Sequence, residues 1–531
     1  MLPIRLAFAQ TNPIVGDFAG NLNQIKSSAL EAAQAGIDLV IYGELALCGY
    51  PLGDLSYRRD IVASSEAALN ELVAFSEAIP NLTLLVGYSR IAQHENPSQS
   101  SKAIAHNSAA AIRAGELLGS YDKQLLPNYD VFDDWRNFIP GDQELVINVS
   151  GARVGVKICE DIWGNQKHPF GTDVDLIAVL NGSPYTFTKS AQRLLAAKNY
   201  ANGVPIAYAN LCGGQDELVF DGGSFVLDKN GAERYQAGFA EGLFQVVDGK
   251  HAELGEDEKL YQVLVCGLRD YLKKTRQTKL VLGLSGGIDS ALCAALAAAA
   301  IGAEKVVGVA MPSRYSSDHS VSDAKAVARN LGLEYREVPI EPAHLAFEQM
   351  LALSPLAQEN LQARLRAVIL MGISNSENRL LLTTGNKSEV AVGYSTIYGD
   401  SAGGFAPIKD LLKTDVWRMS RFVNERAGKE LIPIASIEKP PSAELRPGQL
   451  DQDTLPDYEI LDGIIRILVE QNQTASQAVA AGYPEDLVLK TDAMIRAAEW
   501  KRSQGAIGTK LSEVSFGSGR RVPITTRFET R

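Results

Sequence analysis

Short apolar runs alternate with stretches of helical periodicity along the first half of the chain. The runs typical of strands are residues 4–9, 39–42, 82–86, 109–112, 154–158, 176–180, 205–209 and 224–227. Most of them are bounded by Gly, Pro, Asn or Asp, which favour turns. Residues 21–36 have a polar start and end at Gly36, so they predict a helix. Buried strands with interleaved helices indicate an α/β fold.

A charged segment separates this series from a second one. Residues 248–259 (DGKHAELGEDEK) are interpreted as a linker between a domain at 1–247 and a domain at 260–531. Directly after it, Leu260, Val263, Leu264 and Leu268 lie on one stripe and predict an amphipathic helix. Further strands are predicted at residues 279–284, 306–311, 334–338 and 379–384. A chain of 531 residues is too long for one core, which also favours several domains.

Composition excludes some classes of protein. The hydrophobic share of 46% and charged share of 21% are ordinary, which argues against disorder and fibrous repeats. The net charge of -12 disfavours a nucleic-acid partner. The cysteines number 5 and form no C-x-x-C pair, which argues against a disulfide framework. No signal peptide is recognised, and the longest apolar run, 291–303, is too short to span a bilayer, so we expect a cytoplasmic protein without a membrane partner.

The most specific local signal is the run LGLSGGIDS at residues 282–290. An apolar strand enters a glycine-rich turn, and an Ala-rich helix follows at 291–300. Glycines let backbone N–H groups approach an oxyanion, and the helix N-terminus adds a favourable partial charge. Asp289 suits a Mg²⁺ ion that bridges phosphates. The run is not Walker A, because Gly-Lys-Ser/Thr is absent. The alternative is a plain strand–turn–helix connection.

The full run resembles the pyrophosphate-binding loop of N-type ATP pyrophosphatases, which cleave ATP to AMP and pyrophosphate while adenylating an oxygen. Later blocks at 359–366 (ENLQARLR), 382–389 (LTTGNKSE), 393–400 (GYSTIYGD) and 438–445 (EKPPSAEL) resemble the NAD synthetase family, over about residues 260–531. The resemblance implies a Rossmann-like parallel sheet of the adenine-nucleotide α-hydrolase type. It also implies a homodimer or a higher homo-oligomer.

The same resemblance implies ligands for each substrate. ATP would be bound by Ser285, Gly286, Gly287, Ile288, Asp289, Ser290 and Thr384, with Lys413 at its phosphates. Deamido-NAD would be bound by Asn360, Glu389 and Lys501. Mg²⁺ would be shared by Asp289 and Glu389. The alternative for each residue is an ordinary surface or strand-end role. Residues 394–407 are predicted to be a closing loop, and 504–531 a surface or active-site tail.

A second candidate site lies in the first half. Cys159 follows the strand at 154–158, Glu44 follows the strand at 39–42, and Lys123 stands between them in sequence. Chemistry in open α/β sheets gathers beyond the carboxyl ends of strands. A carboxylate can deprotonate a thiol, and an ammonium group can stabilise the thiolate and an oxyanion. These residues therefore make a coherent amide hydrolase. Taken singly, Cys159 is more often a buried hydrophobe, and Glu44 and Lys123 are more often surface charges.

The blocks at 43–50 (GELALCGY), 123–132 (KQLLPNYDVF) and 157–161 (KICED) resemble the nitrilase family of carbon–nitrogen hydrolases, over about residues 1–245. The resemblance implies an αββα sandwich, with Glu44 as general base, Lys123 as transition-state stabiliser and Cys159 as nucleophile. In the glutaminase branch it assigns glutamine binding to Tyr129, Ser183 and Lys189. Asp134 departs from the pattern, because relatives usually carry Glu there.

Together the two halves predict a ligase. Glutamine hydrolysis in the first half would supply ammonia, and the second half would use ATP to amidate deamido-NAD to NAD. A closed route for ammonia is expected, because free ammonia is largely protonated at neutral pH. Three alternatives remain open: a related amidotransferase with another acceptor, an amidase with a regulatory nucleotide sensor, and a binding protein with degenerate sites.

Overall fold

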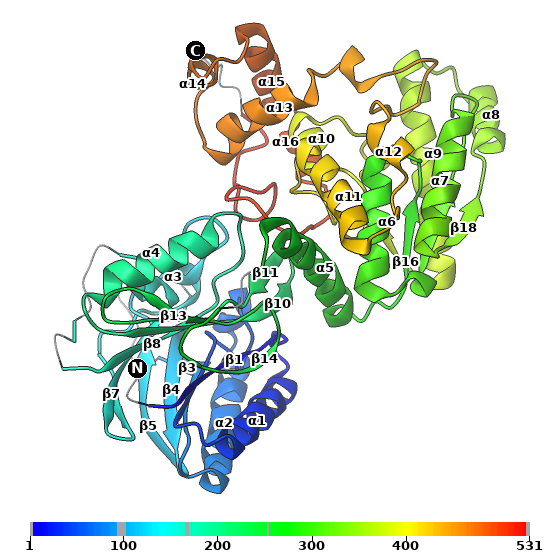
Figure 1. The fold of residues 1–531 in the computed structure, drawn as a ribbon. Helices are drawn as coiled ribbons and strands as arrows, with labels where there is room; N and C mark the ends of the chain where they lie inside the picture. Colours follow the sequence, from blue (N-terminus) through cyan, green and yellow to red (C-terminus); the bar gives the residue numbers. More distant parts are fainter. Residues whose placement is uncertain (1–3, 93–101, 165–168, 171–172, 252–253, 527–531) are drawn as a thin grey trace. The chain divides into compact units, whose positions relative to one another are not determined.

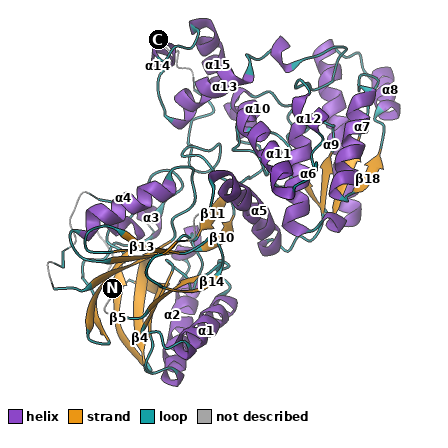
Figure 2. Ribbon diagram, viewed as in Figure 1, coloured by secondary structure: helices purple, strands orange, loops and turns teal. Residues whose placement is uncertain are grey.

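The computed structural model describes residues 4–92, 102–164, 169–170, 173–251 and 254–526. The chain divides into two compact units, Met1–Gly255 and Glu256–Arg531 (Figure 1). Figure 2 shows that strands of the first unit form broad layers, whereas helices dominate the second.

The first unit contains two mixed sheets. One sheet has the order β14-β1-β2-β3-β4-β5, and its neighbours β1, β2 and β3 are parallel. Its strands are β1 Leu6–Gln10, β2 Leu39–Tyr42, β3 Thr83–Ile91, β4 Ala105–Arg113, β5 Glu116–Asp122 and β14 Gly242–Gln245. The other has the order β15-β13-β12-β9-β8-β7-β6, with β7, β8 and β9 parallel. Its strands are β6 Val146–Val149, β7 Ala152–Ile158, β8 Leu176–Asn181, β9 Ile206–Asn210, β12 Phe225–Leu227, β13 Glu233–Gln236 and β15 Lys250–His251. A hairpin joins β10 Cys212–Gln215 to β11 Leu218–Asp221.

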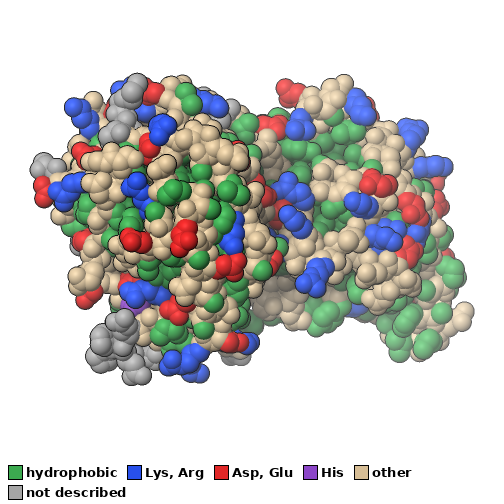
Figure 3. Space-filling view, turned by 90° about the horizontal axis from the view of Figure 1, so that it is seen from below, with side chains coloured by type: hydrophobic (Ala, Val, Ile, Leu, Met, Phe, Trp, Pro, Cys, Tyr) green, Lys and Arg blue, Asp and Glu red, His purple; other side chains and the backbone are tan. Residues whose placement is uncertain are grey.

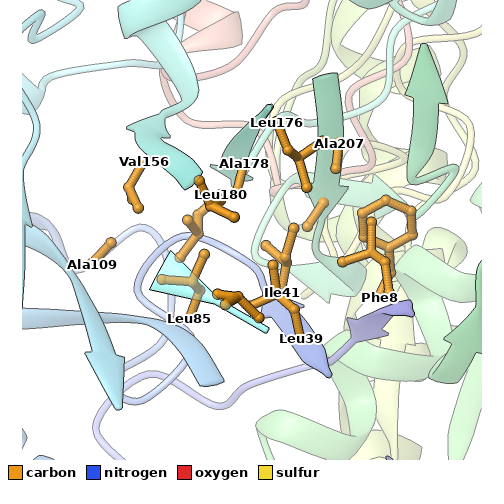
Figure 4. Close-up of a cluster of buried hydrophobic side chains, with 14 of the residues drawn as sticks. Phe8, Leu39, Ile41, Leu85, Ala109, Val156, Leu176, Ala178, Leu180 and Ala207 are labelled. Atoms are coloured by element: carbon orange, nitrogen blue, oxygen red, sulfur yellow. The ribbon is translucent and has the colours of Figure 1, made fainter. Parts of the chain in front are cut away.

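Alternation along each strand explains how these sheets stack. Leu39 and Ile41 of β2 enter a core that also contains Leu176 and Leu180 of β8, so it lies between the two sheets (Figure 4). The residue between them, Val40, packs instead in a second core with helices α1 Phe18–Gln34 and α2 Arg59–Phe75.

A third core lies on the outer face of the other sheet, against α4 Lys189–Ala201. The short helix α3 Asp134–Asn137 completes the helices of this unit within the described residues. Helices therefore cover both outer faces, which confirms the predicted αββα sandwich.

The second unit is built on a parallel sheet with the order β18-β17-β16-β19. Its strands are β16 Leu280–Gly283, β17 Val306–Ala310, β18 Glu334–Glu337 and β19 Leu380–Leu382. The chain leaves β16 toward β17 on one side, and later returns to place β19 on the other side of β16. The carboxyl ends of β16 and β19 thus flank a topological switch point, where ligands of open α/β sheets bind.

Helices surround this sheet and extend the unit (Figure 1). They are α5 Glu256–Lys274, α6 Ile288–Ile301, α7 Asp318–Leu331, α8 Glu341–Met350, α9 Pro355–Glu377, α10 Lys387–Val392, α11 Lys413–Ala427, α12 Ile434–Glu438, α13 Tyr458–Ile465, α14 Ala475–Ala480, α15 Glu485–Ala497 and α16 Glu499–Arg502. Side chains of α9 pack on β16, β17 and β19 through Leu365 and Leu370. No described helix has both the length and the apolar character that crossing a membrane requires.

The predicted strands are all present, with ends shifted by a few residues. The sequence missed β5, β6, β10, β11, β13 and β14, which are short, polar or at sheet edges and therefore lack a clear alternating signal. The expected linker is partly regular structure, because Lys250–His251 forms β15 and α5 begins at Glu256. Three acidic residues, Glu256 to Glu258, favour that early helix start.

The face shown in Figure 3 carries acidic and basic side chains interspersed with one another. On this face, therefore, neither sign of charge prevails (Figure 3).

Replacing Leu85 tests the central core of the first unit. Leu85 is fully buried on β3, so Leu85→Ala should lower the free energy of unfolding by about 2–5 kcal/mol. Leu117→Ala is the matched control, because Leu117 is 46% exposed on β5 and should change stability by about 0.5 kcal/mol or less. Urea unfolding followed by circular dichroism measures both. Equal losses would contradict this assignment of the core.

Candidate functional site

A buried charged cluster lies beyond the parallel strands of the first unit. The Lys123 Nζ lies 2.7 Å from the Glu44 Oε1 and 2.6 Å from the Asp134 Oδ2. The Lys123 and Glu44 side chains have no exposed surface. Burial by itself lowers the pKa of Lys123, but the charges of Asp134 and Glu44 raise it well above its ordinary value. The cluster therefore holds an ammonium group between two carboxyl groups.

Asp134 makes this contact despite its short side chain. It is the first residue of α3, and burial raises the pKa of its carboxyl, although Lys123 opposes that shift. One ammonium group does not neutralise two carboxylates, so one of them can accept a proton. A general base must be able to do this.

Glu44 is held by groups from three other segments. Its Oε2 accepts a hydrogen bond of 2.9 Å from the Gly182 N–H, and its Oε1 accepts one of 2.7 Å from the Asn107 Nδ2. The turn after Glu44 passes so close to β3 that a Cβ at Gly87 would collide with the Leu45 backbone. Leu45 itself has a φ of 49°, in the left-handed region. The carboxylate is therefore fixed by backbone and side chain together.

Cys159 stands at the end of β7, at the start of a 3₁₀ turn over Cys159–Ile162. Its φ of 41° is a strained value for a residue with a Cβ, and such strain is frequent at active sites. Burial raises the pKa of the Cys159 thiol well above its ordinary value; the charge of Glu44 adds to this, and Lys123 opposes it. The thiol is thus protonated at neutral pH and needs a base to become a nucleophile.

Asp161 ties the Cys159 turn to the Lys123 segment. Its carboxylate accepts hydrogen bonds from the Ile158 N–H at 3.0 Å, the Leu125 N–H at 2.8 Å and the Tyr121 hydroxyl at 2.8 Å. Sequence reasoning gave Asp161 and Asn107 no role. Asn107 lies between His106 and Ser108, ahead of the apolar run at 109–112 that predicted β4, so it gave no local signal.

The residues expected to bind glutamine lie around Cys159. The Tyr129 hydroxyl donates to the Glu160 Oε2 at 2.9 Å, next to Cys159 in the chain. The Lys189 Nζ lies 4.2 Å from the centre of the Trp163 ring, just after the Cys159 turn. Ser183 is buried in the loop after β8. Tyr129 and Lys189 therefore contact residues of the segment that carries Cys159.

The second unit contains a cavity of about 340 Å³ at the switch point between β16 and β19. Expected residues that line it are Ser285, Gly287, Ile288, Asp289, Ser290, Thr384, Glu389, Lys413 and Lys501. Unexpected charged residues in the lining are Arg366, Asp400, Lys409, Lys439, Glu444, Asp451 and Arg502.

The glycine-rich turn leads from β16 into α6. Gly286 has a φ of 79°, and a Cβ there would collide with the Ser320 carbonyl oxygen. The Ser285 Oγ accepts from the Gly287 N–H at 3.2 Å and lies 3.2 Å from the Ser290 Oγ. These contacts hold the turn at the helix N-terminus, where backbone N–H groups can face an anion.

Lys413 and Asp289 form the charged centre of this cavity. The Lys413 Nζ lies 2.5 Å from the Asp289 Oδ2 and 3.6 Å from the Glu389 Oε1. Burial opposes a charge on Lys413, but Asp289 and Glu389 raise its pKa. Burial and the Asp289 charge raise the pKa of Glu389 to about 8. Asn386, which the sequence did not single out, donates to the Asp289 Oδ1 at 2.8 Å.

The remaining expected residues, Thr384, Asn360 and Lys501, differ in how they lie relative to the cavity. Thr384 follows β19 and lines the cavity. The Lys501 Nζ donates to the carbonyls of Gly393 and Ser395, at 2.8 and 2.7 Å. Asn360 is not among the described residues that line the cavity; its Oδ1 accepts a 3.0 Å hydrogen bond from the Thr396 Oγ1. All three therefore contact or border the loop predicted at 394–407.

The tail predicted at 504–531 packs against that loop in its described part. The Ala406 N–H donates to the Ile507 carbonyl at 2.8 Å, and the buried Asp410 accepts from the Leu511 and Ser512 N–H groups at 2.7 Å each. Gly505 and Ala506 line the cavity. The start of the tail is therefore part of the site.

The donor set here fits Mg²⁺. Two carboxylates whose charges repel each other, Asp289 and Glu389, face the same cavity, and carboxylate oxygens are ligands that Mg²⁺ accepts. No group of three or more His, Cys, Asp or Glu in the described part of the chain is arranged to hold a metal ion. Mg²⁺ usually completes its shell with water and substrate phosphates, so a pair of protein ligands is sufficient.

Comparison with known families agrees with both sites. Residues 5–242 match the carbon-nitrogen hydrolase family, and residues 260–505 match the NAD synthase family. The resemblances predicted from sequence are therefore confirmed.

Whole-length relatives combine these two families. The glutamine-dependent NAD(+) synthetase of Thermotoga maritima is 41% identical over 100% of both chains. The glutamine-dependent NAD+ synthetase of Acinetobacter baumannii, solved with adenosine diphosphate, is 35% identical, with a TM-score of 0.76 and 98% of both chains covered. The Cytophaga hutchinsonii enzyme of the same name shares the fold, with a TM-score of 0.84 at 22% identity and 98% coverage of both chains. The chain belongs to the family of glutamine-dependent NAD(+) synthetases.

Proposed function

We propose that the chain amidates deamido-NAD to NAD at the expense of ATP, with ammonia from glutamine, and releases AMP, pyrophosphate and glutamate. One observation carries this proposal. A single chain has a buried Glu–Lys–Cys cluster in one unit and a glycine-loop cavity in the other, and it aligns over its whole length with a glutamine-dependent NAD(+) synthetase. The proposed domains are residues 1–247 and 260–531, joined by 248–259.

In the first unit, Cys159 attacks the glutamine carboxamide after Glu44 takes the thiol proton. The Lys123 ammonium stabilises the oxyanion that develops on the former carbonyl oxygen. Ammonia leaves with a proton from Glu44, and a thioester forms between the glutamyl group and Cys159. Glu44 then deprotonates water, which hydrolyses the thioester to glutamate and restores the thiol. Tyr129, Ser183 and Lys189 hold the substrate for both steps.

In the second unit, the nicotinate carboxylate of deamido-NAD attacks the α-phosphorus of ATP, and pyrophosphate leaves into the 285–290 turn. Backbone N–H groups of this turn and the Lys413 ammonium stabilise the charge on the departing phosphates. Thr384 contributes to ATP binding, and Asn360, Glu389 and Lys501 hold deamido-NAD. Ammonia attacks the adenylated carboxyl group, and AMP leaves. Bound Mg²⁺ would neutralise phosphate charge, and Asp289 with Glu389 would hold it.

We also propose that the enzyme is cytoplasmic and forms at least a homodimer. Apolar side chains on α8 and α9 support the second point: Met350 is 71% exposed, Leu356 66% and Val368 68%. Large exposed apolar side chains on packed helices such as α8 and α9 can become part of an interface.

Replacing the proposed nucleophile tests whether the first unit hydrolyses glutamine and the second unit carries out the amidation. Cys159→Ala should lower glutamine-driven NAD formation by at least about 10³-fold and leave ammonium-driven formation within about twofold, since the nucleophile acts only on glutamine. NAD and AMP are followed with deamido-NAD, Mg-ATP and either donor. If the wild type forms NAD from neither donor but still hydrolyses an amide, this result would instead support an amidase with a nucleotide sensor.

Asp134→Asn tests the second carboxylate beside Lys123. Removing its charge lowers the pKa of Lys123 and weakens a charged hydrogen bond of 2.6 Å. The kcat of glutamine hydrolysis should fall about 10- to 100-fold. Asp134→Glu keeps the charge and should recover most of the rate. Glutamate release measures both variants, and an unchanged kcat for Asp134→Asn would contradict a catalytic contribution.

Removing Mg²⁺ tests the carboxylate pair of the second unit. With EDTA, NAD formation from ammonium should stop while glutamine hydrolysis continues, because only the phosphoryl chemistry needs the ion. Asp289→Asn should raise the Mg²⁺ concentration for half-maximal rate by about tenfold or more, since one ligand charge is lost. The control is Asp486→Asn at an exposed position on α15. An Asp289→Asn variant with the Mg²⁺ requirement of the control would contradict this site.

A further inference from the structure

A buried arginine lies behind the proposed glutamine site and has no role in the mechanism above. Arg193 is on α4, one turn after Lys189, so both side chains leave the same face of the helix. Its side chain is only 3% exposed. A charge at this depth requires partners.

The partners of Arg193 are concentrated on one loop. Its Nε donates to the Ser183 Oγ at 3.0 Å, and its Nη2 donates to the Ser183 carbonyl at 2.7 Å and the Pro184 carbonyl at 3.0 Å. The Nη1 pairs with the Asp221 Oδ1 at 2.7 Å, in a carboxylate that is 1% exposed. Burial lowers the pKa of Arg193, but Asp221 outweighs this and the pKa is raised. Arg193 thus stays charged and holds the Ser183 loop by hydrogen bonds to Ser183 and Pro184.

The loop backbone has a separate anchor. The Ser183 N–H donates to the Asn210 Oδ1 at 3.0 Å, and the Asn210 Nδ2 donates to the Ser183 carbonyl at 3.1 Å. Arg193 makes two hydrogen bonds to this loop that Asn210 does not make, one to the Pro184 carbonyl and one to the Ser183 hydroxyl. Of these two, only the second fixes the direction of a side-chain hydrogen bond.

Arginine donates hydrogen bonds and never accepts them. The Ser183 oxygen is therefore the acceptor in this pair, and its single proton is left for another acceptor, either the neighbouring Tyr208 hydroxyl or a bound substrate. A side-chain amide or a water molecule in place of the guanidinium could donate or accept. The direction of the hydrogen bond with the Ser183 hydroxyl would then not be fixed. Glutamine offers a carboxylate as an acceptor, and the Lys189 cation on the same helix also suits a carboxylate.

We propose that Arg193 is a positioning residue that fixes Ser183 as a hydrogen-bond donor to the α-carboxylate of glutamine. The inference rests on the proposed function of the first unit. It makes Arg193 a determinant of substrate choice, because an amide without that carboxylate gains nothing from a Ser183 donor.

A double-mutant cycle tests this assignment on the full-length enzyme. Ser183→Ala and Arg193→Lys should each raise the glutamine KM of hydrolysis about tenfold with little change in kcat. If Arg193 acts through the Ser183 hydroxyl, the double variant should have the KM of Ser183→Ala alone. An additive increase of about a hundredfold, or a normal KM in Arg193→Lys, would overturn the proposal.

A second substrate separates positioning from a structural role. 4-Aminobutanamide is glutamine without its carboxylate, and its hydrolysis should be slow and equal in the wild type and in both single variants. Equal losses with both substrates would mean that Arg193 only supports the fold. Arg5→Lys is the matched control, because Arg5 makes a two-pronged pair with Asp38 before β2, at the opposite strand ends. Its glutamine KM should equal that of the wild type.

The outcomes also separate this inference from the proposed function. If the wild-type enzyme does not hydrolyse glutamine, the proposed function of the first unit fails. If it does, and Arg193→Lys keeps the wild-type KM, only the positioning role fails. Ammonium-driven NAD formation by the same preparations reports on the second unit independently.

Discussion

The ammonium group of Lys123, buried between Glu44 and Asp134, constrains how the elements of the first unit can be arranged. Moving a charge this far from water costs several kcal/mol, and removing one partner of a buried pair costs about 3–5 kcal/mol. The cluster can exist only if β2, β4, β5 and α3 bring their polar groups to one point. Hydrogen bonds from Asn107 and Gly182 help to compensate the buried charge of Glu44. The αββα fold thus positions the catalytic groups because it keeps the charged groups of Lys123, Glu44 and Asp134 in contact.

The second unit uses the same electrostatic arrangement for another purpose. Lys413 also lies between two carboxyl groups, those of Asp289 and Glu389, but the three face a cavity rather than a closed core. Burial, and then the Asp289 charge, raise the pKa of Glu389 to about 8, and the Lys413 ammonium opposes this only in part. A divalent ion and phosphates can join such a group because the existing balance is incomplete, whereas the closed cluster around Lys123 keeps its partners.

Sequence predicted the strands that carry the cores, because these runs are apolar and bounded by turn residues, and it placed Glu44, Cys159 and Ser285 at strand ends. It did not show that Lys123 contacts Asp134, since the pair depends on how a loop and the short helix α3 meet in space. Asn107, Asp161 and Asn386 escaped notice for a related reason. Each holds a group from a segment distant in the chain; although Asp161 and Asn386 stand in the blocks at 157–161 and 382–389, nothing local shows which partner they contact.

Buried charges supply the information that local patterns lack. An exposed lysine or arginine needs no partner, so its position says little. A buried one must be paired, and its partners show which segments the fold has to keep in register. Arg193 meets this criterion, because its hydrogen bonds join α4, the Ser183 loop and Asp221 of β11. The fully buried Lys387 is comparable, since it pairs with Asp410 and Glu470 and so ties the start of α10 to two later segments. In both units, buried charged residues therefore show which distant segments the fold has to keep together.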